Sequence, residues 1–247
     1  MPQFLFFYTR YVLIAILTLI SIGCVSTEHN TTKIVMVDIP GSNFKLSQTE
    51  ITFDTYDEYV NSTNRHSPSD AGWGRKYRPV INISWKDIQG FIVWLNITEK
   101  PDNPYRLPTE IEWELASSGG LSDTYWWGDR VLINSANCNQ SCKDEFSKTS
   151  PVASFTPNQY GLYDTSGNVW EWTQTKGLHH NSSVSPMRGG NKLRGAENLY
   201  VLKGGSWEND ISRIETKSKA MYGENTRHYS FGFRLAQDKL FSEKIHT

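Results

Sequence analysis

This 247-residue sequence has few cysteines and histidines and almost no net charge. It has three cysteines and six histidines, and its 25 Lys and Arg residues nearly cancel 26 Asp and Glu residues, leaving a net charge of −1. Such a balance gives no reason to expect a surface for nucleic acid or for an anionic membrane. The histidines form no His-x-x-x-His-x-Glu pattern, and the sequence has no Ser/His/Asp set, phosphate-binding loop or zinc motif.

Aromatic residues are abundant instead. Nine Trp and eleven Phe residues are too much apolar surface for a solvated coil, which excludes disorder for most of the chain. The 18 Gly and 10 Pro residues favour turns and irregular loops over a helical bundle. Because no repeat and no internal linker divides residues 33–238, we expect one α+β domain with long ordered loops there, followed by a tail at 239–247.

The first residues are typical of an export signal. Residues 1–27 contain a single charged side chain, Arg10, and an apolar run that ends just before Gly23 and Cys24. The run is too short for a comfortable membrane span, so residues 1–23 are interpreted as a signal peptide and residues 24–32 as a polar tether.

The residues before Cys24 resemble the lipobox of bacterial lipoproteins, although Ser21 stands where Leu is usual. That resemblance implies lipidation of Cys24 and attachment to the membrane of the bacterial cell envelope. Val25, which is not Asp, favours the outer over the inner membrane. An ordinary signal peptide or an uncleaved anchor is the alternative.

The other two cysteines, Cys138 and Cys142, lie four residues apart. Export to an oxidising compartment allows a disulfide between them, and two free thiols are the alternative.

Local patterns place the expected helices and strands. Helices are expected at 53–61, capped by Thr52, after Ser84, which forms a capping box with Asp87, and after Thr109, which forms one with Glu112. Strands are expected at 33–39, 44–51, 80–83, 152–155, 169–173, 201–204 and 232–236.

Several segments in the same order resemble the formylglycine-generating-enzyme (sulfatase-modifying-factor) domain. They cover nearly all of residues 33–238 and include RPVINISW at 78–85, YRLPTEIEWELA at 105–116, NQYGLYD at 158–164, GNVWEW at 167–172, GGSW at 204–207 and GFRLA at 232–236. The resemblance implies a variant of the C-type-lectin fold with little regular secondary structure. Most of this signature specifies the fold rather than catalysis.

Within these segments we expect core aromatic side chains and buried ion pairs. Trp85, Trp113, Trp170 and Trp172 are the expected core residues. Arg106 and Arg234 are expected to pair with glutamates such as Glu110 or Glu114.

The resemblance also implies structural calcium at two loops. Calcium takes several oxygen ligands, including backbone carbonyls. One predicted site uses the side chains of Asp164 and Glu171 with the carbonyls of Gly167 and Val169, and the second uses Asn137, Cys138, Asp144 and Phe146. Surface carboxylates or helix caps are the alternative.

Catalytic formylglycine-generating enzymes carry a copper-binding cysteine pair after the Gly-Gly-Ser segment. Asn209 and Ile214 occupy those two places here, and neither can supply a thiolate to copper. We therefore do not expect formylglycine generation.

Two classes of function remain. One is an envelope-anchored binding module for a protein or small-molecule ligand. The other is a metal-dependent oxidoreductase with different chemistry, similar to the pyoverdine-tailoring members of this superfamily. The expected ligand surface lies in the segment 206–231, between two strands that define the fold, and consists of Trp207, Asn209, Arg213, Tyr222, Arg227, His228 and Tyr229. A solvated loop is the alternative.

Overall fold

A computed structural model describes residues 33–177 and 198–240 of the chain. The predicted signal peptide, the lipidation of Cys24 and the tether at 24–32 lie outside the described residues and stay predictions. Within the described ranges, every helix is too short or too polar to cross a membrane.

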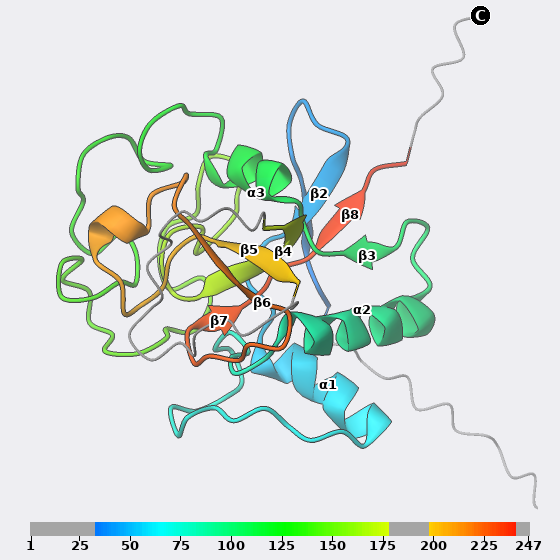
Figure 1. Cartoon of the computed structure of the whole chain (residues 1–247). Helices are drawn as coiled ribbons and strands as arrows, with labels where there is room; N and C mark the ends of the chain where they lie inside the picture. The colour runs from blue at the N-terminus through cyan, green and yellow to red at the C-terminus, as the bar shows by residue number, and fades with distance from the viewer. Residues whose placement is uncertain (1–32, 178–197, 241–247) are drawn as a thin grey trace, which may run out of the picture. The chain divides into compact units, whose positions relative to one another are not determined.

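Two four-stranded sheets form the framework of the described domain (Figure 1). The first has the order β1-β2-β8-β3 and the second the order β6-β5-β4-β7. The pairs are antiparallel except β4–β7, which is parallel. The strands are β1 Met36–Asp38, β2 Phe44–Ser47, β3 Tyr105–Arg106, β4 Trp170–Lys176, β5 Leu199–Lys203, β6 Lys219–Gly223, β7 Phe231–Gly232 and β8 Ala236–Asp238.

Three α-helices and a 3-10 turn accompany the sheets: α1 Phe53–Thr63, α2 Trp85–Glu99, α3 Glu110–Ser117 and η1 Ile211–Arg213. The predicted caps are confirmed, because the side chains of Thr52, Ser84 and Thr109 each accept a backbone N–H of the first turn. Helices α1 and α2 pack against each other, and α3 packs against β4 and β5 (Figure 1).

The main core lies between α1, α2 and the second sheet. The rings of Tyr56 on α1 and Phe91 on α2 stack 5.3 Å apart. Trp113, Trp170 and Trp172 are wholly buried, as expected. Trp85 is only half-buried, and it packs on the outside of the core with its ring stacked at 4.0 Å on the buried Tyr200.

Two predicted strands are wrong and a third is divided. Residues 80–83 form no strand: the bridge between Thr52 and Pro79 ends just before them, and the chain then enters the cap of α2. Residues 152–155 turn instead of pairing, because the Ala153 N–H donates to Asp164. The predicted strand 232–236 divides between β7 and β8, so residues 233–235 cross from one sheet to the other.

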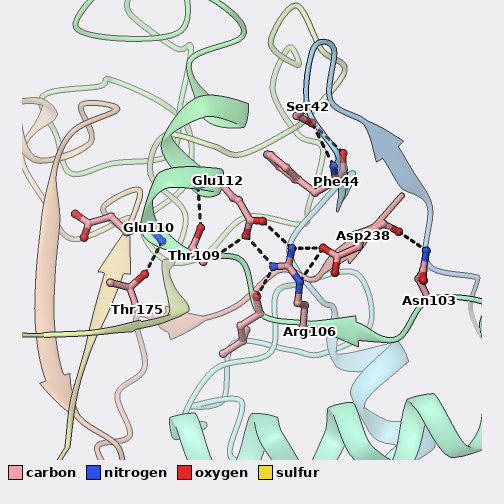
Figure 2. A network of polar contacts seen from close by, with 10 residues as sticks. Ser42, Phe44, Asn103, Arg106, Thr109, Glu110, Glu112, Thr175 and Asp238 are labelled. Carbon is pink, nitrogen blue, oxygen red and sulfur yellow. Dashed lines mark hydrogen bonds and ion pairs between the residues drawn. The ribbon is translucent and has the colours of Figure 1, made fainter. Parts of the chain in front are cut away.

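Arg106 joins three elements, but not through the predicted glutamates (Figure 2). Its Nη2 donates to Glu112 at 2.6 Å and to Asp238 at 2.5 Å. The capping box explains this choice, because it folds the Glu112 carboxylate back to the Thr109 N–H, beside Arg106. Glu110 and Glu114 pair with Lys219 and Lys203 instead.

Candidate functional site

The buried partner of Arg234 is Glu171, and this also differs from the prediction. The Arg234 Nε donates to Glu171 Oε2 at 2.6 Å and its Nη2 donates to Oε1 at 2.7 Å. Trp113 Nε1 donates to the same Oε2 at 2.6 Å. All three side chains are wholly buried, so the pair fixes β4, α3 and the crossing segment to one another.

Two further carboxylates lie in the same electrostatic environment. Burial raises the pKa of Asp164 to about 6, against the lowering effects of the Ala153 N–H and Arg234. Burial, with repulsion from Asp164 and Glu171, raises the pKa of Glu50 well above its usual range. Glu50 accepts hydrogen bonds from the Asn168 amide and the Val169 N–H. Three acidic groups therefore surround one buried guanidinium.

The two predicted calcium loops lie against each other. Asn137 and Gly167 form a parallel bridge, and the Asn168 N–H donates to the Asn137 carbonyl at 2.8 Å. Gly167 has a φ of +84° and approaches the Asn137 carbonyl so closely that a Cβ would collide with it. Only glycine fits this contact.

Glu171 does not fit the calcium site predicted at 164–171. Both of its oxygens already accept from Arg234, and one also accepts from Trp113. A cation at Glu171 would lie beside a buried guanidinium of the same charge, so Glu171 is a poor ligand for calcium in this structure.

The loop at 137–146 fits calcium better. The Asn137 Oδ1 is buried and has no hydrogen-bond partner among the described residues, while its Nδ2 donates to the Lys148 carbonyl. Asp144 stands in the same loop, with its oxygens accepting from the Cys138 and Phe146 N–H groups. Within the described ranges, no cluster of three or more His, Cys, Asp or Glu side chains is arranged to hold a metal, so carbonyl and amide oxygens would have to complete this site.

A disulfide closes this loop. Cys138 and Cys142 are bonded to each other, both side chains are buried, and they pack with Ile214 in a small apolar cluster. The two thiols are therefore bound to each other rather than available as metal ligands.

Both positions that match the catalytic cysteines are part of the packed structure. The Asn209 Oδ1 accepts from the N–H and the hydroxyl of Ser206, which closes a tight turn after β5. Ile214 is wholly buried in the cluster beside the disulfide. Ile214 is therefore inaccessible, and the half-buried Asn209 side chain is engaged in the turn.

The structure brings together only part of the predicted ligand surface. Trp207 and Tyr229 have ring centroids 5.8 Å apart, and His228 stacks on Tyr229 at 4.1 Å. Arg213, on η1, lies over the ring of Trp170 instead. Tyr222, on β6, contacts Phe231.

Arg227 belongs to a different part of the surface. It donates twice to Asp87 at the start of α2, at 2.8 Å each. This pair lines a cavity of about 790 Å³ together with Tyr56, Tyr59 and the loop that follows α1.

Two residues that contact Trp207 were not predicted from the sequence. Trp73 meets Trp207 edge-to-face at 5.3 Å, and the Lys148 Nζ lies 4.9 Å from the Trp207 centroid. Both come from loops far from Trp207 in the sequence, and no local pattern marks either one. We call Trp73, Trp207, Glu208, His228 and Tyr229 the aromatic surface.

The chain belongs to the sulfatase-modifying factor enzyme 1-like domain family, whose domain matches residues 18–239. It is 38% identical over 152 residues to the inactive C-alpha-formylglycine-generating enzyme 2 of Mus musculus, covering 57% of this chain and 42% of that protein. It is 31% identical over 195 residues to the formylglycine-generating enzyme of Mus musculus, covering 73% and 50%. The chain thus spans about half the length of these curated relatives.

The fold prediction is confirmed by solved structures. PvdO from Pseudomonas aeruginosa superimposes with a TM-score of 0.66 at 20% identity, covering 83% of this chain and 91% of that one. The domain is thus a formylglycine-generating-enzyme-like variant of the C-type-lectin fold, in which two short sheets and three helices hold long loops.

Proposed function

We propose that this chain is a non-catalytic binding module of its family, anchored to the bacterial cell envelope through a lipidated Cys24. The observation that carries the proposal is that the two positions of the catalytic cysteines have structural roles here. Asn209 closes a turn, and Ile214 is buried beside a disulfide. A relative of 38% identity is itself named inactive, which agrees with this proposal.

The aromatic surface is the proposed ligand-binding surface. Its rings come from separate loops and are only partly covered, with Tyr229 37% exposed. Tyr and Trp are the residues that most often carry binding energy at interfaces, because they supply large rigid contact areas.

Replacing Tyr229 with alanine is expected to reduce the capture of envelope partners about 30-fold, the loss that a central aromatic contact of about 2 kcal/mol causes. The melting temperature should change little, because Tyr229 lies partly outside the core. Tyr77→Ala is the matched control, since Tyr77 is 65% exposed and lies outside the aromatic surface. The measurement is quantitative mass spectrometry of proteins cross-linked to each variant. Equal capture by Tyr229→Ala and the unmodified chain would contradict the proposal.

Calcium is proposed to stabilise the loop at 137–146 through Asn137 and Asp144, with the carbonyls of Cys138 and Phe146. At about 100 times its dissociation constant, a bound ion adds about 2.7 kcal/mol. A chelator should then lower the melting temperature by roughly 5–10 °C.

The Asp144→Asn variant should have a lower melting temperature than the unmodified chain, and the chelator should change it little. Glu145→Gln is its control, because Glu145 is the exposed neighbour in the same loop and should keep the full response. If the unmodified chain melts at the same temperature with and without chelator, this loop holds no stabilising calcium.

A further inference from the structure

Three rings of the aromatic surface, those of Trp73, Trp207 and Tyr229, pack against one another, and we call this cluster the aromatic box. Trp73 meets Trp207 at 5.3 Å and Tyr229 at 5.7 Å, with interplanar angles of 84° and 71°. Trp207 and Tyr229 lie 5.8 Å apart. Trp73 and Trp207 are half-buried and Tyr229 is exposed, so part of this cluster is accessible from the surface.

A cation of the chain itself already lies over this box. The Lys148 Nζ is 5.0 Å from the centroid of Trp73 and 4.9 Å from that of Trp207. Among the described residues, no carboxylate forms a salt bridge with Lys148, which is exposed. The ammonium is therefore held by the electron-rich faces of two indoles.

A carboxylate with unused capacity adjoins the same rings. The Glu208 Oε2 accepts from the Tyr229 hydroxyl at 3.1 Å, whereas its Oε1 is buried and has no hydrogen-bond partner among the described residues. His228 lies 3.7 Å from that oxygen. Burial lowers the pKa of His228 despite the opposing effect of Glu208, and the His228 Nδ1 accepts from the Ser230 N–H, so this nitrogen is not a donor to Glu208.

The geometry points to a binding site for the alkylammonium group of a lysine side chain on a partner protein, with Lys148 as its intramolecular stand-in. Aromatic faces attract ammonium ions through their quadrupoles, and a nearby carboxylate adds attraction by its opposite charge. This inference rests on the proposed binding function and names the chemistry that the aromatic surface selects.

The test compares two soluble probes on the full chain purified in detergent. Nα-acetyl-lysine amide carries the ammonium, and Nα-acetyl-norleucine amide is its neutral counterpart of similar shape. The NMR shifts of the indole N–H groups of Trp73 and Trp207 report binding. The Lys148→Ala variant should bind the lysine probe about fivefold more tightly than the unmodified chain, because its own ammonium no longer competes.

Three comparisons make the result specific. Lys217→Ala removes an exposed lysine elsewhere and should bind the lysine probe as the unmodified chain does. Adding Glu208→Gln to Lys148→Ala should weaken binding of the lysine probe at least threefold, because the negative charge is lost. The melting temperature of the double variant should stay that of Lys148→Ala, because the side chain keeps its size. The norleucine probe should bind at least tenfold more weakly. Equal binding of the two probes to Lys148→Ala, or no shift with either probe, would overturn the inference.

The inference and the proposed function fail in different experiments. If Tyr229→Ala loses partner capture but the two probes bind Lys148→Ala equally, the binding module stands and the ammonium site is overturned. If Lys148→Ala selects the lysine probe but Tyr229→Ala captures partners normally, the ammonium site is supported and the proposed function is not.

Discussion

Replacing Arg234 with methionine is expected to lower the free energy of unfolding by about 3–5 kcal/mol, which corresponds to roughly 10–15 °C in melting temperature. The guanidinium is the partner of Glu171 and lies within the field of Glu50 and Asp164. Its removal leaves three buried carboxylates without a cation, and an unpaired buried charge costs far more than a lost surface pair.

Urea denaturation with matched variants checks this expectation. Arg227→Met is the control, because Arg227 also donates twice to a carboxylate but is exposed, and such pairs contribute about 0–1 kcal/mol. Adding Glu171→Met to Arg234→Met should recover part of the loss, since both charges are then removed. An Arg234→Met variant within about 1 kcal/mol of the unmodified chain would show that the pair does not hold the core together.

Replacing Gly205 with alanine is expected to cost about 2–4 kcal/mol. Gly205 has a φ of +75°, and a Cβ there would lie 2.5 Å from the Arg213 carbonyl oxygen and 2.6 Å from the Ile214 Cγ2. Both neighbours are fixed by packing, so the turn that holds Asn209 and Ile214 must shift. The absence of a side chain at Gly205 thus leaves room for Ile214, which is wholly buried.

The variant Gly41→Ala measures the cost of backbone strain alone, without the steric clash that Gly205→Ala adds. Gly41 has a similar φ of +70°, but no atom lies within 4 Å of its ideal Cβ position. This variant should cost only about 1 kcal/mol, the strain of a left-handed alanine. Chemical denaturation of both variants gives the difference. If the two substitutions cost the same, Gly205 makes no close contact with Ile214.

Features that depend on neighbours in the sequence were predictable. The capping boxes of α2 and α3 need only a hydroxyl and a carboxylate three residues apart, as at Thr109 and Glu112, and both form. The fold could likewise be predicted from the family resemblance, because the family's motifs occur in the same order along the chain.

Features that join distant segments were not predictable in detail. Glu171 and Arg234 are 63 residues apart, and nothing local tells which glutamate an arginine will meet. Buried apolar residues at 80–83 suggested a strand, yet a segment can be buried without a ladder when its ends are fixed by a bridge and a helix cap. Trp73 meets Trp207 only through the tertiary fold, so one of the three rings of the aromatic box could not be predicted from local sequence patterns.

The central claim is that this chain retains the family fold without the family's cysteine oxidation. The most direct test incubates the full chain with copper(I), oxygen and a cysteine-containing sulfatase peptide, and measures formylglycine by mass spectrometry beside an active formylglycine-generating enzyme. We predict no product above the level without protein, because Asn209 and Ile214 supply no thiolates and Cys138 and Cys142 are bonded to each other. Copper-dependent conversion over many turnovers would contradict the account.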